Sequence, residues 1–306
     1  MKNKPTLTSN GVRKKVRAYL AATQAKNTQL AYQNDLAHFL RSGGRIPATP
    51  KSVASYLAIH AETLSIATLN RRVVAIGRAH SVKGFVSPTQ STLVTNTLRG
   101  IRRINGSVQR QAIPLLKTDM VNITKKLTGL IGLRDKALLL IGFAGAFRRS
   151  ELVELQVEDV RFVPEGVVIH LRRGKTDQNG LGRNVAIPFV KGRHCPVRAL
   201  KAWLKQSGIE SGTLFRRFNR YEQIMQQGLT AQSVALIIKQ RVAESGLNPE
   251  QYSGHSLRAG LVTSAAKAGV SSWKIRQQTG HKSDLMLQRY IRDSQLFVDH
   301  AVCKLW

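Results

Sequence analysis

Apolar side chains recur every three or four residues along the first hundred positions, the spacing of helices that bury one face. Four helices are predicted, beginning near Asn27, Pro50, Leu69 and Thr89. Their inward-facing residues are expected to be Tyr32, Leu36, Phe39 and Leu40, then Val53, Tyr56 and Leu57, then Leu69, Val73, Ile76 and His80, and last Leu93 or Val94 with Leu98 and Ile101. Glycines near residues 44 and 84 interrupt the pattern. Residues 26–105 are therefore predicted to form a small helical bundle.

The pattern changes after a polar stretch at 106–113, whose Gly and Ser content indicates a linker. Two β-branched runs, 167–171 and 184–187, lie on either side of a stretch of turn formers and predict a hairpin. Helices are predicted from about Thr118, over 134–147, after Pro196, around 234–242, over 256–267 and over 270–278. Long helices with one short hairpin are typical of a mainly α-helical protein with a small antiparallel β-sheet, the α+β class.

At 306 residues the chain is long enough for two domains. We expect a basic N-terminal segment at 1–25, the bundle at 26–105, the linker at 106–113 and a larger domain at 114–306. The last residues, 294–306, place apolar side chains on one helical face. That face must be buried on its own domain or on a neighbouring subunit.

The chain is strongly basic, with 48 Lys and Arg residues against 17 Asp and Glu, a net charge of +31. Such a field predicts a polyanionic partner. A basic ribosomal-type binder and a protein charged for solubility are the alternatives. The hydrophobic content of 42% favours folded domains over a basic tail.

Arginines gather on the faces of the predicted bundle helices opposite the apolar stripes, without glutamates to pair with them, and this favours contacts with DNA phosphates. The candidate DNA contacts in the bundle are Arg71, Arg72, Arg78, Arg99, Arg102 and Arg103. Those in the second domain are Arg172, Arg216, Arg217, Lys239 and Arg241. Aromatic residues such as Phe215 and Phe218 are expected in the core.

Two cysteines, Cys195 and Cys303, provide neither a disulfide framework nor zinc-site spacing and favour a reducing compartment. The longest apolar run, 137–147, is about half of what a bilayer requires. The N-terminus lacks the apolar core of a secretion signal. We therefore expect a cytoplasmic, nucleoid-associated protein without a membrane partner.

The stretch 254–290 concentrates phosphate chemistry. His255, Arg258 and His281 can neutralise or protonate a phosphate, and the hydroxyl of Tyr290 can attack one. His255 and Arg258 are predicted on the first turn of one helix, where free backbone N–H groups and the helix dipole also favour an anion. Asp284 is the only acid between His255 and Tyr290, too few for a metal-dependent nuclease. We expect no metal and no other cofactor.

The ordered set His255-x-x-Arg258, Gly280-His281 and Tyr290 resembles the C-terminal box of the tyrosine recombinase family, the phage integrase, Cre and Xer group. Upstream, Arg148 precedes Arg149-Ser150-Glu151-Leu152 after an apolar helix, as the catalytic Arg of that family does, although Gly145–Phe147 replaces a commoner Thr-Gly-Leu. Lys175, between the two β-branched runs, occupies the place of the family's mobile catalytic Lys. Glu151 is expected to orient Arg148.

The resemblance implies a SAM-like core-binding bundle followed by a catalytic domain. It implies a site-specific recombinase of a mobile genetic element that cuts and rejoins DNA through a 3′-phosphotyrosyl intermediate, without metal or ATP. Its expected roles are nucleophile for Tyr290, charge stabilisation for Arg148, Arg258 and His281, and proton transfer for His255 and Lys175. Expected partners are duplex DNA with paired inverted half-sites, further copies of the chain in a tetramer on two duplexes joined through 294–306, and accessory DNA-bending proteins.

Two other functions stay open at the sequence level. A type IB topoisomerase would use the same residues to relax DNA, and a non-catalytic sequence-specific binder would need only the basic surface. The short N-terminal segment favours a protein without a separate arm-binding domain. The target sequence and the direction of recombination have no signature in the chain.

Overall fold

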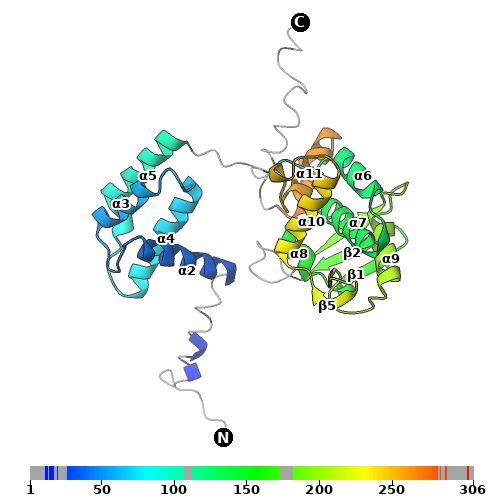
Figure 1. Cartoon of the computed structure of the whole chain (residues 1–306), viewed down its shortest axis with the longest axis horizontal. Helices are drawn as coiled ribbons and strands as arrows, with labels where there is room; N and C mark the ends of the chain where they lie inside the picture. Colours follow the sequence, from blue (N-terminus) through cyan, green and yellow to red (C-terminus); the bar gives the residue numbers. More distant parts are fainter. Residues whose placement is uncertain are drawn as a thin grey trace. The chain divides into compact units, whose positions relative to one another are not determined.

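The computed structural model describes residues 26–106, 112–172 and 182–281, together with single positions at 11–12, 14–16, 19, 283, 287 and 302 (Figure 1). The chain divides into two compact units, Met1–Arg110 and Gln111–Trp306. Mainly helical units with small antiparallel sheets confirm the predicted fold class. None of the described helices is long and apolar enough to cross a membrane.

The first unit is a helical bundle. It contains α2 (Lys26–Arg41), α3 (Pro50–Ile59), α4 (Ile66–Val82), a short 3-10 helix (Pro88–Gln90) and α5 (Thr92–Asn105). Hydroxyl side chains begin three of these helices: Thr49, Ser65 and Ser91 each accept a hydrogen bond from a backbone N–H of the first turn. The core consists of Phe39, Val53, Tyr56, Leu57, Leu69, Ile76, Val94 and Ile101. Of the residues predicted to face inward, Leu40 and Leu93 are exposed instead.

Arg72 corrects the prediction of a uniformly exposed basic face. It is only 8% exposed because it follows Leu69 and precedes Ile76 at helical spacing, and so shares their buried stripe. Its Nη1 donates to the Tyr56 hydroxyl over 2.7 Å and lies 2.8 Å from Nδ1 of His38. Its Nε lies 3.6 Å from a carboxylate oxygen of Asp35. Arg72 therefore stabilises the bundle and is not available to DNA.

Asp35 also pairs with Arg71, through Nε–Oδ2 and Nη2–Oδ1 contacts of 2.6 and 3.0 Å. The acidic partner that the arginine-bearing face of α4 lacks in its own sequence is therefore supplied by a different helix, α2. The Arg71 side chain is 49% exposed, so part of its guanidinium still faces solvent.

The second unit is built around a buried helix. Its elements are α6 (Lys117–Lys125), α7 (Gly129–Ala144), α8 (Arg149–Glu154), a 3-10 helix (Val157–Asp159), β1 (Val160–Val163), β2 (Gly166–Leu171), β3 (Arg183–Pro188), α9 (Pro196–Ser207), β4 (Arg216–Phe218), β5 (Ile224–Gly228), α10 (Ala231–Glu244), a 3-10 helix (Pro249–Gln251), α11 (Ser256–Lys267) and α12 (Ser272–Thr279). The strands form an antiparallel sheet in the order β1-β2-β3 and a separate β4-β5 hairpin. In the first sheet Val160 pairs with Ile169, and Val167 with Ile187.

The predicted hairpin is confirmed by β2 and β3, whereas β1 and the β4-β5 hairpin were not predicted. Helix α7 begins at Gly129, five residues before the predicted start, and ends at Ala144, where Gly145 caps it. The missed first residues, 129–133, contain Gly129 and Gly132, which interrupt the apolar pattern. Arg134 and Asp135, which look like surface residues, are buried. The helix expected around 234–242 is α10, on which Leu236 is 56% exposed.

Arg241 also departs from its predicted role as a DNA contact. Its Nη2 lies 2.6 Å from Asp135 of α7, and its Nη1 lies 2.7 Å from Glu244. Arg134 occupies the other oxygen of Asp135 at 2.7 Å. Since the Arg241 side chain is only 13% exposed, this ion cluster joins α10 to α7 and leaves little of Arg241 for a phosphate.

Asp35→Asn should destabilise the bundle by about 3–5 kcal/mol, because it leaves the buried Arg72 cation without its counter-charge. Hydrogen exchange of peptides from residues 26–106 would show the loss as faster exchange of amides in α2 and α4. The matched control is Arg71→Gln, which removes the exposed partner of the same carboxylate and should cost less than about 1 kcal/mol. Equal effects of the two variants would mean that the buried pair is not what holds these helices.

Candidate active site

The turn between α7 and α8 presents Arg148. Gly145 is required here because a Cβ at this position would lie 2.3 Å from the Phe147 ring. Ala146 takes a positive φ of 51°, a conformation that costs a non-glycine residue about 1–2 kcal/mol. Arg148 then stands immediately before α8, and its side chain is half-buried at 19% exposure.

Glu151 holds Arg148 in place. One of its carboxylate oxygens accepts the backbone N–H of Arg148 over 2.9 Å, and the other accepts Nη1 over 2.6 Å. The carboxylate is 3% exposed. Because Glu151 occupies one edge of the guanidinium, the remaining N–H groups of Arg148 have a defined direction.

Arg258 lies in the first turn of α11 and is 1% exposed. Its Nη1 donates to the Ala146 carbonyl over 2.8 Å, so the strained turn after α7 receives one edge of the guanidinium. Its Nη2 lies 3.1 Å from Nε2 of His281. Close packing sets the position of α11, since a Cβ at Gly260 would lie 1.8 Å from the Leu115 carbonyl oxygen. These contacts bring Arg258 to the turn after α7 that also presents Arg148.

The hydrogen bonds around His281 determine which ring nitrogen carries the proton. Thr279 is fully buried, and its hydroxyl donates to the Ile275 carbonyl over 2.8 Å. That hydroxyl must then accept from Nδ1 of His281, 2.7 Å away. Nε2 is left as the acceptor for Arg258. His281 is therefore the Nδ1–H tautomer of a neutral ring.

The pKa of His281 is lowered from 6.5 to about 3. Desolvation by burial is the largest cause, followed by the positive charges of Arg258, Arg148, His255 and Arg183. His281 and these four neighbours come from four separate segments of the chain and share one electrostatic environment.

His255 is the residue before α11 and is exposed at the surface. Its pKa is lowered, first by desolvation of the ring and then by the charges of Arg258, Arg148 and Arg149. Its backbone N–H donates to the Ser253 hydroxyl over 3.1 Å. Gly254 beside it admits the Arg149 side chain, whose Cδ would lie 1.8 Å from a Cβ. His255 is thus neutral at physiological pH and able to accept a proton.

Lys175 and Tyr290 lie outside the described residues. The chain leaves the described structure after Arg172, at the end of β2, and returns at Gly182, just before β3. Leu287, three residues before Tyr290, is fully buried among Val262, Ala266 and Ile275 of α11 and α12. The structure therefore brings together Arg148, His255, Arg258 and His281, with Glu151 behind Arg148.

Arg183, at the start of β3, was missed by the sequence analysis. Its Nη1 donates to the Gln278 carbonyl over 2.9 Å and its Nη2 to the Thr279 carbonyl over 3.4 Å. It thereby holds the last turn of α12, directly before His281. Burial lowers the pKa of Arg183. The charge of Glu151 raises this pKa and the charge of Arg148 lowers it, and both effects are smaller than that of burial. Nothing in the local sequence sets Arg183 apart from the arginines around it.

Gln278 completes this connection. Its Nε2 donates to the Ala144 carbonyl at the end of α7 over 2.8 Å and to the Ala186 carbonyl of β3 over 3.2 Å. Gly280, in the left-handed conformation that ends α12, has the Arg183 Nε within 3.0 Å of where a Cβ would stand. The end of α12 is thus fixed to both α7 and β3, and the ring of His281 is positioned by residues on three elements.

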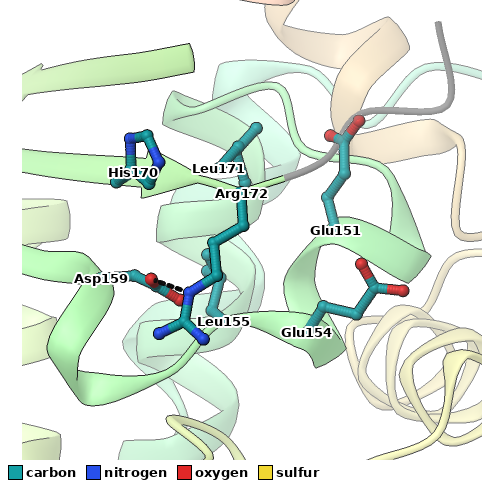
Figure 2. Close-up of a pocket in the computed structure, with 7 residues that line it drawn as sticks. All are labelled: Glu151, Glu154, Leu155, Asp159, His170, Leu171 and Arg172. Atoms are coloured by element: carbon teal, nitrogen blue, oxygen red, sulfur yellow. Dashed lines mark hydrogen bonds and ion pairs between the residues drawn. The ribbon is translucent and has the colours of Figure 1, made fainter. Parts of the chain in front are cut away.

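An acidic cavity of about 250 Å³ lies beside Glu151. Figure 2 shows Glu151 and Glu154 on one side of it and Arg172 reaching Asp159 on the other, where Nε and Oδ1 are 2.7 Å apart. Arg172 remains 60% exposed. Among the residues that the structure describes, no three His, Cys, Asp or Glu side chains gather as a metal site would require.

The other candidate DNA contacts differ in how free they are. Arg78, Arg99, Arg102, Arg103 and Arg217 are exposed. Arg216 uses Nη2 on the Ser211 carbonyl at 2.6 Å and Nη1 on Gln226 at 2.8 Å. Lys239 pairs with Glu250 at 2.9 Å. The exposed candidates lie mostly in the bundle, where Arg99 donates to Asn96 over 3.4 Å and Arg78 lies 5.9 Å from the centre of the Tyr32 ring.

A family model described as the phage integrase family matches residues 115–296. This span exceeds half of the chain. The chain belongs to the phage integrase family, the tyrosine recombinases. It is a tyrosine-type site-specific DNA recombinase, as the resemblance of its motifs implied.

Relatives extend the match beyond the catalytic unit. This tyrosine recombinase is 38% identical over 303 residues to an integrase/recombinase XerD homologue of Selenomonas ruminantium, covering 95% of this chain and 89% of the relative. It is 25% identical over 271 residues to the recombinase Cre of Escherichia phage P1, covering 81% and 77%.

Solved structures share the fold. The XerH recombinase bound to a palindromic difH substrate, a post-cleavage complex, has a TM-score of 0.63 at 20% identity and covers 83% of this chain and 71% of its own. A lambda integrase dimer bound to a COC′ core site has a TM-score of 0.63 at 17% identity, with 94% and 78% covered.

The low pKa of His281 predicts a pH-dependent stability. Between pH 6.5 and about 3 the unfolded ring binds a proton that the folded ring does not, so stability falls as the pH falls through this window. His281→Asn should make the loss shallower. Urea unfolding followed by fluorescence of the buried Trp203 would measure it, with His170→Asn on β2 as control. An unchanged slope in His281→Asn would contradict the assigned burial.

Arg183 should position His281. Arg183→Lys keeps the charge but loses the paired donors to the Gln278 and Thr279 carbonyls, so strand cleavage should fall about 10- to 100-fold through misplacement of the ring. Arg183→Gln removes the charge as well and should raise the pKa of His281, which NMR of the imidazole would report. If both variants cleave normally and leave the imidazole signals unmoved, Arg183 has only a packing role.

Proposed function

We propose that Tyr290 attacks the scissile phosphate of duplex DNA. A bond forms between its phenolic oxygen and phosphorus, and the bond from phosphorus to the 5′ oxygen breaks, which leaves a 3′-phosphotyrosyl link and a 5′ hydroxyl. Attack by a 5′ hydroxyl of the second duplex reverses the step and joins new strands. Energy of the phosphodiester is kept in the covalent link, so the reaction consumes no ATP.

The observation that supports this most is the convergence of Arg148, Arg258 and His281 on the turn after α7. Arg258 is held at two points, by the Ala146 carbonyl and by His281. Arg148 is held by Glu151. Rigid guanidinium groups aimed at one place stabilise the extra negative charge of a five-coordinate phosphate without reorganising during the reaction. The proposed site needs no metal for this role, because the guanidinium groups supply the positive charge.

The two histidines are assigned different parts. His255 is exposed and neutral, and it takes the proton from the Tyr290 hydroxyl as the phosphorus bond forms. In the free enzyme Nε2 of His281 is an acceptor for Arg258. A bound phosphate opposes the positive charges that lower the pKa of His281 and favours a ring with a hydrogen on Nε2, which then donates to a phosphate oxygen.

Lys175 is the proposed donor of the proton that the departing 5′ oxygen needs. Support comes from β2 and β3, which pair from Gly166–Pro188 to Leu171–Arg183 and place both ends of the segment holding Lys175 at one end of the sheet. Arg183 at that end is within the electrostatic environment of His281.

The buried Leu287 limits how far Tyr290 can lie from α11 and α12. Three residues separate the two positions, and three residues span at most about 11 Å.

The bundle is the proposed core-binding domain, and residues 106–113 its link to the catalytic domain. Exposed arginines such as Arg78, Arg99 and Arg103 contact phosphates of a half-site. Relatives solved on DNA support this use of the fold. In the proposed assembly, four copies of the chain bind two duplexes with inverted half-sites. Residues 294–306 join the copies, and DNA-bending proteins assist them. The enzyme acts on DNA in the cytoplasm.

The test is covalent capture on a nicked suicide duplex from the DNA that flanks the gene. Tyr290→Phe should form no adduct on a denaturing gel while binding DNA within about 2-fold, since one oxygen is lost from a surface of phosphate contacts. Tyr221→Phe, at an exposed tyrosine of the same unit, is the control and should form adduct normally. Arg148→Lys should cleave about 100- to 1,000-fold more slowly.

An adduct in Tyr290→Phe would place the nucleophile elsewhere. Cleavage abolished by EDTA and restored by Mg²⁺ would overturn the metal-free mechanism. Relaxation of a supercoiled plasmid without strand exchange between two duplexes would favour a topoisomerase.

A further inference from the structure

A second concentration of positive charge lies on the catalytic unit, beside α9. It consists of Lys125 at the end of α6, Lys136 of α7, Arg193 in the loop before α9, and Arg198, Lys201 and Lys205 of α9. We call these six residues the α9 patch. All are exposed except the half-buried Lys136.

Hydrogen bonds bring these separate segments together. The Thr124 hydroxyl lies 2.9 Å from Nδ1 of His194 and so joins the end of α6 to the loop before α9. Nη1 of Arg198 donates to the carbonyls of Val190 and Gly192 in that loop, over 3.1 and 3.4 Å. The pKa of His194 is lowered by desolvation and then by the charges of Lys136, Arg193 and Lys125, which places those cations around one ring.

The stripe on α9 is continuous. Arg198, Lys201 and Lys205 stand three and four residues apart on the side away from the buried Val197, Leu200 and Trp203. From Arg198 to Lys205 the helix rises about 10 Å. Lys201 lies over the rings of Phe162 and Phe189, with Nζ 5.0 and 5.3 Å from their centroids, which covers both rings and holds the stripe against the sheet.

These charges have no internal compensation. In the described parts of the chain, none of the six forms an ion pair with a carboxylate. Residues 189–209 contain no acid, and Asp135 near Lys136 is buried between Arg134 and Arg241. Like charges gathered without partners repel one another, and an anionic ligand would offset that repulsion.

The α9 patch is separate from the candidate active site. The charges that act on His194 and those that act on His281 have no residue in common. Lys136 stands eight residues before the end of α7, about 12 Å along its axis, and Arg148 lies beyond that end. A phosphate at Arg148 therefore leaves the patch unused.

We propose that the α9 patch binds the phosphate backbone of a second duplex DNA segment, distinct from the segment that is cut. Duplex DNA fits because the patch offers cations in a row, and because the two half-buried rings beside it, Phe162 and Phe189, already have the Lys201 ammonium over them. The contact is independent of sequence and strongly dependent on salt. It would hold the enzyme on DNA and bring a second segment near the first.

The test compares two variants with the same change in net charge. The patch variant is Lys125→Gln, Arg193→Gln, Lys201→Gln and Lys205→Gln, which leaves the loop-binding Arg198 in place. The control is Lys117→Gln, Arg161→Gln, Arg220→Gln and Lys267→Gln, four exposed cations on different elements of the same unit. Both are made in the full chain and titrated with a labelled random-sequence duplex of about 16 base pairs at low salt.

The native chain and the control should bind two duplexes per chain, and the patch variant should bind one. At the weaker site of the native chain, the slope of log K against log salt should correspond to the release of about 3 to 4 counterions. The patch variant should lack this release. Covalent adduct on the suicide duplex should form equally in all three proteins. Because the titration does not depend on cleavage, failure of the phosphotyrosyl mechanism would leave this result readable.

Equal stoichiometry in the patch variant and the control would overturn the proposal. So would a patch variant that loses binding of polyglutamate while keeping both duplexes, since the partner would then be an acidic protein segment. Circular dichroism checks that both variants are folded. If the patch variant is unfolded, the double variant Lys125→Gln with Lys205→Gln replaces it. The affinity of this double variant for the second duplex should fall about 10-fold or more.

Discussion

The candidate active site depends on the burial of one charged group, the guanidinium of Arg258. It is 1% exposed, and it donates to the Ala146 carbonyl and lies 3.1 Å from Nε2 of His281. Desolvating a cation is costly unless its donors are used. The positive-φ turn at Ala146 and the neutral His281 supply acceptors, so the shape of the turn and the protonation of the ring both follow from placing this charge in the interior.

A strongly basic chain uses its cations in two ways. Arg72, Arg134 and Arg241 are buried against Asp35 or Asp135, where they hold helices together. Other cations are left exposed without acids, on the bundle and beside α9. Among the buried carboxylates, Asp35 and Asp135 each pair with two arginines, whereas Glu151 and Asp159 each pair with one.

Much of the fold was predictable because its signals are local. The period of apolar residues found α3, α4, α9, α11 and α12, and β-branched runs found the β2-β3 hairpin. The β4-β5 hairpin escaped because Arg216–Phe218 is a three-residue strand with two arginines. The start of α7 escaped because Gly129 and Gly132 interrupt the apolar pattern. The burial of Arg134 and Asp135 escaped because it depends on Arg241, which is 106 residues from Asp135.

By itself, the sequence determined the order and spacing of the catalytic motif, the helical periods and the large positive charge, since each is a property of neighbouring residues or of composition. Only the tertiary structure decided which arginines are exposed, which nitrogen of His281 carries hydrogen, and that Arg183 holds the end of α12. Those properties depend on contacts across long separations, such as the 112 residues between Ala146 and Arg258. Burial and charge pairing are set by partners that the fold brings together, and local pattern carries no record of them.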